Sequence, residues 1–385
     1  MLSKKLSQIS PSVTLAITAT AKKMAKEGEK IVNFAAGEPD FPTPEHIKEA
    51  AHQAIDANFT RYTPSSGTLE LKEAICLKLQ KENSLSFKPS NVLVSCGAKH
   101  SLFNAILALV NPEDEVLMPV PYWVSYPEMV KVAGGTLKFI KTNKENNFKI
   151  TRENLDKAIT KKTKLLILNS PCNPSGSLYR KEELEALSEV IVEKNIYVIS
   201  DEIYEKLIYE GKFSSIASLG KKVKELTIVI NGVSKTYSMT GWRIGYMAGP
   251  EEVIKIASNL QSHSTSNPCS ISQKAALAAI TSDQGFISDI VKEFKRRRDY
   301  LVENLNQTKI KAQKSQGTFY TFCDISQTNL DSLSFCKRLL EEEKVATVPG
   351  KAFGMDSFVR VSFACSFEDI KEGVEKIKNW VAKLK

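Results

Sequence analysis

Residues 231–246 of the chain read N-G-V-S-K-T-Y-S-M-T-G-W-R-I-G-Y. An apolar run, Thr227–Asn231, leads into this stretch, so Lys235 follows closely after an expected strand. Ligands in open α/β sheets bind at the carboxyl ends of the strands. An ammonium that leaves water at such a place has a lowered pKa, which favours Schiff-base chemistry. Eight residues further on, Arg243 is suited to hold a phosphate through two hydrogen bonds.

Outward from this stretch, short apolar runs alternate with amphipathic stretches. The runs are mostly continuous and rich in Val, Ile and Leu, which is typical of strands buried on both faces of a sheet. The expected strands are Val92–Ser95, Glu115–Val120, Lys164–Asn169, Tyr197–Asp201, Thr227–Asn231 and Ile244–Ala248. The expected helices are Leu69–Asn83, Ser101–Val110, Lys181–Lys194 and Glu251–Leu260. This alternation predicts an α/β domain with a largely parallel sheet.

The two ends of the chain have other patterns. Thr43-Pro44-Glu45 is a typical helix start, with a capping threonine and a proline at the first helical position. A long helical stretch, Phe286–Asn306, has no interior Gly or Pro and is expected to connect two domains. The elements expected after it form a smaller α+β unit: Thr318–Asp324, Ser332–Lys344, Phe358–Phe363 and Phe367–Leu384.

Four more stretches place polar groups at the ends of expected strands or inside one. They are Ser200–Tyr204 with Asp201, Asn169–Gly176, Ser95–Lys99 ahead of a helix, and Val359–Phe363 with Arg360. Backbone N–H groups at a helix start bind phosphate, and a half-buried arginine in an apolar strand needs an anionic partner. Taken singly, each has a plainer interpretation, such as a helix cap at Asp201 or a surface charge at Lys235.

Length and composition exclude several classes of protein. The chain has 385 residues, of which 42% are hydrophobic and 25% charged, as in folded globular chains of two or three domains. The longest apolar runs fall far short of the ~20 residues of a membrane span, and the polar, basic segment Met1–Ser10 does not resemble a signal peptide. The net charge of +9 comes from scattered residues and short clusters such as Arg296-Arg297-Arg298, which favours a solvated basic surface or anionic small substrates over nucleic acid.

Cysteine and histidine patterns give no sign of a metal site or a disulfide framework. Seven cysteines, an odd number, include no C-x-x-C pair. His46 and His52 are six residues apart, on different faces of a helix, so we interpret the four histidines as structural or surface residues. A reducing cytoplasm fits this cysteine usage.

Read together, the motifs resemble the pyridoxal-phosphate aminotransferases of fold type I, class I, and most closely the bacterial aspartate aminotransferase subgroup. The resemblance runs from Pro11-Ser12 to the C-terminal helix. The motifs that carry it are A-A-G-E-P-D-F (35–41), R-Y-T-P-S-S-G (61–67), P-Y-W-V-S-Y-P-E-M (121–129), N-P-S-G (173–176), D-E-I-Y (201–204), S-K-T-Y-S-M-T-G-W-R (234–243) and R-V-S-F-A (360–364). The resemblance implies a large domain with a mostly parallel seven-stranded sheet and a smaller α+β domain. It places an N-terminal arm and part of the small domain at 1–45, the large domain at 46–285, and the connector helix and small domain at 286–385.

The resemblance also implies the role of each site residue. Lys235 forms the Schiff base with pyridoxal phosphate and moves the substrate proton, and Asp201 keeps the pyridine nitrogen protonated. Tyr204 and Asn173 hydrogen-bond the ring oxygen, Trp123 stacks on the ring, and Asn173 and Trp123 also line the substrate site. The backbone of Ala98 and Lys99, with Arg243 and Ser234, holds the phosphate, and Tyr62 reaches it from the partner subunit of a homodimer. Arg360 binds the substrate α-carboxylate, close to Gly37.

Two positions bear on the substrate. Gly232 stands where many relatives have a phosphate-binding serine, and Lys99 stands where the aspartate-specific subgroup has a lysine that meets the distal carboxylate. In relatives that transaminate prephenate, a basic residue often precedes the N-terminal Pro-Ser, and here that residue is Ser10. We therefore expect an aspartate:2-oxoglutarate aminotransferase without prephenate activity, acting on small amino and oxo acids in the cytoplasm. The alternatives are transfer from aromatic, alanine or prephenate-type partners, a lyase that eliminates at Cβ, and a basic nucleic-acid-binding protein that is not an enzyme.

Overall fold

The computed structural model describes residues 6–11 and 13–384 of the chain. Met1–Lys5, Ser12 and Lys385 lie outside the described residues, and with them half of the Pro11-Ser12 motif and half of the segment Met1–Ser10. No helix in the described part combines the length and the apolar character needed to cross a bilayer.

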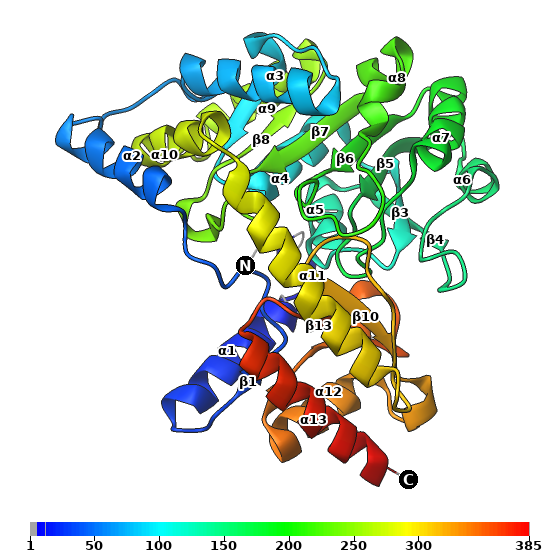
Figure 1. Ribbon diagram of the computed structural model, residues 1–385. Helices are drawn as coiled ribbons and strands as arrows, with labels where there is room; N and C mark the ends of the chain where they lie inside the picture. The colour runs from blue at the N-terminus through cyan, green and yellow to red at the C-terminus, as the bar shows by residue number, and fades with distance from the viewer. Residues whose placement is uncertain (1–5, 12, 385) are drawn as a thin grey trace.

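A seven-stranded sheet forms the upper part of the molecule in Figure 1. Its strand order is β2-β8-β7-β6-β5-β3-β4, and only β8 runs against its neighbours, so the predicted, mostly parallel α/β sheet is confirmed. The strands are β2 (Val92–Ser95), β3 (Glu115–Val120), β4 (Thr136–Lys141), β5 (Thr163–Asn169), β6 (Tyr197–Asp201), β7 (Thr227–Gly232) and β8 (Gly245–Ala248). Six of them match the apolar runs of the sequence, and β4 was not predicted.

Both faces of this sheet are buried, which is why its strands are continuously apolar. In β5, Leu165 and Ile167 pack into one core while Leu166 and Leu168 pack into another. The first face is covered by α4 (Ala98–Leu109), α5 (Ser125–Ala133) and α9 (Glu251–Ser262). The second face is covered by α3 (Leu69–Asn83), α7 (Lys181–Lys194) and α10 (Ser270–Thr281). The remaining helices of this part are α2 (Glu45–Asp56), α6 (Arg152–Ala158) and α8 (Lys221–Glu225).

The long helix α11 (Gly285–Leu305) runs from the seven-stranded sheet to a second, smaller sheet in Figure 1. That sheet is antiparallel, with the order β12-β13-β10-β9, and packs against the C-terminal helices. Its elements are β9 (Lys311–Ala312), β10 (Tyr320–Asp324), β12 (Val348–Pro349), β13 (Phe358–Ser362), α12 (Ser332–Glu343) and α13 (Phe367–Lys383). The helix α1 (Val13–Lys26) and the short parallel pair β1 (Val32–Asn33) and β11 (Val345–Ala346) lie beside it.

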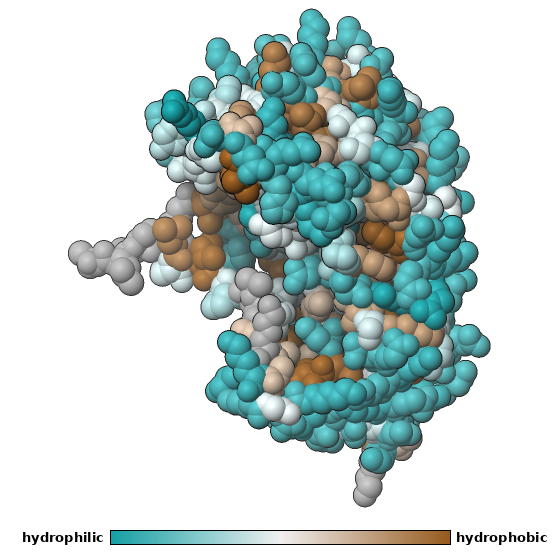
Figure 2. Space-filling view, turned by 60° about the vertical axis from the view of Figure 1, so that its left-hand side comes forward, coloured by the Kyte–Doolittle hydropathy of each residue, from teal (hydrophilic) through white to brown (hydrophobic). Residues whose placement is uncertain are grey.

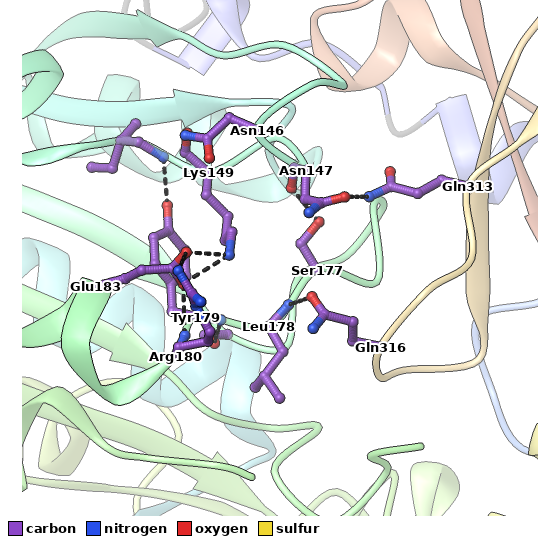
Figure 3. A network of polar contacts seen from close by, with 12 residues as sticks. Asn146, Asn147, Lys149, Ser177, Leu178, Tyr179, Arg180, Glu183, Gln313 and Gln316 are labelled. Carbon is purple, nitrogen blue, oxygen red and sulfur yellow. Dashed lines mark hydrogen bonds and ion pairs between the residues drawn. The ribbon is translucent and has the colours of Figure 1, made fainter. Parts of the chain in front are cut away.

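A polar network joins the loop after β4 to the segment that follows α11 (Figure 3). Gln313 Nε2 donates to Asn147 Oδ1 at 3.1 Å, and the backbone N–H of Leu178 donates to Gln316 Oε1 at 3.2 Å. In the same loop, Phe148 packs edge-on against Phe358 of β13. These contacts therefore hold the two sheets together near the loop that carries the N-P-S-G motif (173–176).

Two expectations from the sequence are wrong. Helix α2 begins at Glu45 with Pro44 as its cap residue, and the hydroxyl of Thr43 donates to the carbonyl of Ser238 at 2.7 Å instead of capping the helix. A tertiary contact thus takes the hydroxyl that the local pattern assigned to the helix end.

The basic cluster Arg296-Arg297-Arg298 is not a uniformly solvated surface. Arg297 and Arg298 share the buried face of α11 with Phe294, three and four residues before them. Arg297 pairs with Asp40 at 2.7 Å, and Arg298 pairs with the neighbouring Asp299 at 2.6 Å. The helical period therefore turns these two cations inward, where they are neutralised within the chain.

Candidate active site

A cavity of about 420 Å³ opens at the carboxyl ends of β5, β6 and β7, where they meet the smaller sheet. The surface in Figure 2 is hollowed between the upper and the lower part of the molecule. Eleven of the twelve site residues expected from the sequence line the cavity: Gly37, Ala98, Lys99, Trp123, Asn173, Asp201, Tyr204, Ser234, Lys235, Arg243 and Arg360. The twelfth, Tyr62, is 91% exposed and lies outside it.

Lys235 projects into the cavity from the loop that follows β7. Its Nζ donates to the carbonyl oxygen of Gly37 at 2.6 Å. The pKa of the Lys235 ammonium is lowered to about 8, mainly by burial and also by the cations Arg360 and Arg243, while Glu38 and Asp201 act in the opposite direction. A lysine of this kind has a usable fraction of neutral amine near pH 7.

Asp201 is the last residue of β6 and is buried. The Tyr126 hydroxyl donates to its Oδ2 at 2.6 Å, and the backbone N–H of Ile203 donates to its Oδ1 at 3.2 Å. Burial raises the pKa of the Asp201 carboxyl to about 6, although these two hydrogen bonds and Lys235 oppose the rise. The hydrogen bond from Ile203 to Oδ1 is the local backbone cap that the sequence offered as an alternative role for Asp201. The same side chain also lines the cavity, so the two roles are compatible.

Arg360 lies in the middle of β13 and is only 2% exposed. Its Nη1 donates to Asn173 Oδ1 at 3.1 Å and its Nη2 donates to the carbonyl of Ala35 at 3.0 Å. Its Nε is buried with no hydrogen-bond partner, and no acidic side chain of residues 6–11 or 13–384 forms an ion pair with it. A buried guanidinium without a carboxylate is costly, so the cavity is built to receive an anion at this place.

Arg243 forms the opposite wall, beside the first turn of α4. Its Nη2 donates to the carbonyl of Cys96 at 3.3 Å. Gly97 has a φ of +89°, and a Cβ there would lie 2.4 Å from the same Nη2, so only glycine lets the guanidinium approach the helix start. The N–H groups of Ala98 and Lys99 lie in this first turn, and a helix start with a neighbouring arginine is a typical phosphate site.

The glycine at position 232 has a packing cause. Gly232 pairs with Gly245 across β7 and β8, and a Cβ at 232 would lie 2.9 Å from the Gly245 Cα. A serine side chain therefore does not fit here without a shift of the backbone. Ser234, two residues later, is buried and lines the cavity instead.

Lys99 and Trp123 face each other at the cavity rim. The Lys99 ammonium lies 4.9 Å from the centre of the Trp123 ring, and burial, then Arg243, lowers the pKa of Lys99. The Trp123 ring meets Tyr126 edge-on at 5.2 Å.

Two tyrosines that sequence reasoning missed complete the site. Tyr126 holds Asp201, and Tyr320 of β10 accepts a hydrogen bond from the Tyr204 hydroxyl at 3.3 Å. Tyr126 lies inside the quoted stretch 121–129, so position in a motif was its only signal. Tyr320 lies in an apolar strand and reads as a core aromatic, so the sequence offered no signal for it.

The charges that line the cavity are unequal. Four cations, Lys99, Lys235, Arg243 and Arg360, stand against the carboxylates of Asp201 and Glu38. Both the volume and the excess of positive charge suit a small ligand with several anionic groups.

Comparisons with known proteins agree with this arrangement. The family model described as "Aminotransferase class I and II" matches residues 29–377. An aspartate aminotransferase of Bacillus subtilis is 46% identical, with 99% of each chain covered, and an aspartate/prephenate aminotransferase of Nitrosomonas europaea is 45% identical, with 98% of each covered. A solved aspartate aminotransferase from Thermus thermophilus, with maleate, superimposes with a TM-score of 0.96 at 42% identity, covering 98% of this chain and 99% of the other.

Proposed function

The chain belongs to the class I and II aminotransferases, and from this premise we propose that it is a pyridoxal-phosphate-dependent aspartate aminotransferase. The reaction moves the amino group of L-aspartate to 2-oxoglutarate and yields oxaloacetate and L-glutamate. The observation that carries the proposal is the buried, unpaired guanidinium of Arg360, which faces the same cavity as Lys235 and Asp201. A group that binds a carboxylate thus lies beside groups that move a proton.

The donor set fits pyridoxal phosphate. Arg243 and the start of α4 suit its phosphate, Asp201 suits a protonated pyridine nitrogen, and the Lys235 amine suits its aldehyde carbon. When bound, the cofactor supplies a conjugated ring that accepts the electrons released at the substrate α-carbon. Burial raises the pKa of Asp201 to about 6, still below pH 7, and a protonated pyridine nitrogen beside it would lower that pKa, so the ionised carboxylate would hold the ring nitrogen in its protonated form.

Lys235 is the proton carrier of the proposed reaction. With a pKa of about 8, its amine is a base strong enough to take the α-proton and, once protonated, an acid that returns it to the cofactor carbon. Tyr204 and Asn173 would orient the ring through its oxygen, and Trp123 would cover its face. Ser234 adds a hydroxyl on the phosphate side.

The substrate is proposed to lie between two cations. Arg360 takes the α-carboxylate next to Gly37, and Lys99, at the rim, takes the distal carboxylate that aspartate and glutamate share. Relatives named as aspartate aminotransferases support this choice. We also assign Tyr62, exposed in the single chain, to the phosphate of a partner subunit in a homodimer. Seven free cysteines support a cytoplasmic location.

A half-reaction tests the proposal and separates it from its rivals. The purified protein should show a visible cofactor absorbance that borohydride removes, and aspartate alone should convert it to a stable amine form with release of one oxaloacetate. A lyase would instead turn over continuously without 2-oxoglutarate. A protein without the absorbance that binds DNA or RNA would refute the enzyme assignment altogether.

Prephenate is a second candidate amino acceptor, because several relatives are named aspartate/prephenate aminotransferases. Ser10 stands where a basic residue is expected for that activity, and its backbone N–H donates to Glu128 at 3.0 Å. Steady-state assays with prephenate in place of 2-oxoglutarate decide between the two acceptor ranges.

A further inference from the structure

Tyr320 lines the cavity and contacts both Arg360 and Tyr204. Its ring centre lies 4.1 Å from the Arg360 guanidinium carbon, and its hydroxyl accepts a hydrogen bond from Tyr204. It is 1% exposed, so its position is fixed by packing. Nothing in the sequence motifs points to this residue.

The register of the smaller sheet places Tyr320 under Arg360. In the antiparallel pair of β10 and β13, Tyr320 lies opposite Ser362 and Phe322 lies opposite Arg360. Directly opposed residues point to the same face, so Tyr320 is a diagonal neighbour of Arg360 on that face. The cavity side of this sheet therefore presents the arginine and the tyrosine ring as a unit.

Arg360 needs this support because few of its donors are occupied. A guanidinium has five N–H groups. Asn173 and Ala35 take one each, and Nε is buried without a partner. Two hydrogen bonds to side-chain or backbone oxygens leave the plane of the group free to tilt. The Tyr320 ring at 4.1 Å, nearer than the Phe353 ring at 5.3 Å, restricts that tilt and attracts the cation. A planar fork in a fixed orientation is what two-point binding of a carboxylate requires.

The hydroxyl of Tyr320 lies next to the backbone of Gly37. A Cβ at position 37 would be 3.6 Å from it, and the Gly37 carbonyl accepts the Lys235 ammonium. The tyrosine thus adjoins the residue proposed to lie near the α-carboxylate, the arginine that binds that carboxylate, and the lysine that takes the proton.

From these contacts we propose that Tyr320 is a positioning residue for the substrate α-carboxylate, whose ring sets the plane of the Arg360 guanidinium. This inference rests on the proposed function and deepens it. Of the contribution that Tyr320 makes to carboxylate affinity, it assigns the larger share to the ring and the smaller share to the hydroxyl.

The test measures binding of maleate, an unreactive dicarboxylate, to the cofactor-loaded protein by calorimetry, so that no turnover is needed. Tyr320→Leu removes the ring and should weaken maleate binding roughly 10- to 30-fold, the range of a desolvated cation–π contact. Tyr320→Phe keeps the ring and should change the affinity less than threefold. The KM for aspartate should follow the same order, while kcat changes less than KM.

A matched pair elsewhere in the chain supplies the control. Tyr209 lies 4.9 Å from the buried Arg298 guanidinium and its hydroxyl bonds to Thr318, but it does not line the cavity. Tyr209→Leu and Tyr209→Phe should lower the melting temperature by amounts similar to the Tyr320 variants and leave maleate binding unchanged.

Three outcomes would overturn the inference. Tyr320→Leu with wild-type maleate affinity would make the residue only structural, and equal losses in the Leu and Phe variants would assign the effect to the hydroxyl. A loss of the same size in Tyr209→Leu would make it a general consequence of destabilisation. Failure of the proposed function looks different: the wild type would bind neither maleate nor a monocarboxylate such as butyrate, or would bind them without transaminating aspartate.

Discussion

Two groups of ionisable side chains adjoin the end of β6, and only one of them is balanced. Asp201 and Glu202 are consecutive, so their side chains point to opposite faces. Asp201 faces the cavity with its surplus of cations. Glu202 faces a closed group, here called the Glu205 cluster, that consists of Lys78, Asn83, Ser200, Glu202, Glu205 and Ser215.

The Glu205 cluster satisfies its own charges. Lys78 pairs with Glu205, and Asn83 donates to the same carboxylate at 2.6 Å. Burial acts to lower the pKa of Lys78, but the charge and hydrogen bond of Glu205, together with the charges of Glu82 and Glu202, raise that pKa above its usual value. The adjoining hollow has only about 10 Å³. Both groups are buried and rich in charge, so the comparison teaches that surplus charge beside open volume, rather than buried charge itself, marks the ligand site.

The two lysines should give the largest contrast. Lys235→Ala should retain the fold and bind the cofactor, yet lose about 10⁴-fold or more in kcat. Proton transfer by a positioned group gives ~10²–10⁴-fold, and the variant also loses the amine that forms the Schiff base. Stopped-flow measurement of the half-reaction with aspartate checks this. Wild-type transamination by the variant would remove Lys235 from the reaction.

Lys78→Met makes the matched change in the Glu205 cluster. It leaves the Glu205 carboxylate buried without its cation, and breaking such a pair costs about 3–5 kcal/mol of unfolding free energy. Urea unfolding at pH 7 measures the loss, and kcat of the protein that remains folded should be close to wild type. A stable variant with a low kcat would show that this cluster takes part in the reaction.

Asp201→Asn should act on activity rather than on stability. The amide cannot hold a proton on the pyridine nitrogen, and we expect a loss of about 10²–10³-fold in kcat, of the size found when a positioned acid–base partner is removed. The Tyr126 hydroxyl still has an oxygen to bond, so the melting temperature should change little. The absorbance spectrum and the rate with aspartate are measured together. A wild-type spectrum and rate in the variant would remove Asp201 from the reaction.

The sequence predicted most of the main sheet that positions these two groups, but not all of it. Six strands of the main sheet were found because burial on both faces leaves continuous apolar runs. Strand β4 (Thr136–Lys141) was missed because it is the edge strand and most of its side chains are exposed, so T-L-K-F-I-K reads as neither a buried run nor a clear alternation.

The motifs named the charged members of the site but not the aromatic residues that hold them. Lys235 and Asp201 were indicated by residue type and by their position at strand ends, and Arg360 was indicated by its charge inside an apolar strand. Tyr320 comes near Arg360 only through the register of β10 and β13, and a register between strands far apart in the chain is not written in either strand. The predicted helix cap at Thr43 was wrong for the same reason, because its hydroxyl binds Ser238, which is 195 residues away in the chain.

A substitution of Lys99 tests whether this cation binds the distal carboxylate of the substrate or the phosphate of the cofactor. At ~4 Å, two unit charges attract by about 1 kcal/mol in water and about 4 at an effective dielectric of 20, so Lys99→Ala should cost roughly 10- to 1,000-fold in kcat/KM. The loss should appear with aspartate and glutamate and be absent with alanine and phenylalanine. Half-reactions on these four donors isolate it, and cofactor binding should persist because the backbone N–H at 99 remains. An equal loss on all four would assign Lys99 to the phosphate and withdraw the preference for dicarboxylates.

Glu202→Gln should give the smallest effect, and its sign depends on pH. Burial raises the pKa of the Glu202 carboxyl from 4.5 to about 8, and the charge of Glu205 adds to the rise. Between these values the folded chain keeps a proton that the unfolded chain releases, so this group's contribution to stability falls as the pH rises from about 4.5 to about 8. Glutamine copies the neutral acid and does not titrate, so the stability of the variant relative to the wild type should rise by about 2 kcal/mol or more between pH 4.5 and pH 8. The Oε2 position has no hydrogen-bond partner for the new amide, and this cost is the same at every pH, so the slope with pH carries the test. Urea unfolding at pH 5, 6.5 and 8 measures the slope, with Glu205→Gln as the control that loses the Lys78 pair and destabilises at every pH. If wild type and Glu202→Gln show the same dependence on pH, Glu202 is ionised in the folded chain, and the Glu205 cluster carries the same kind of uncompensated charge as the cavity.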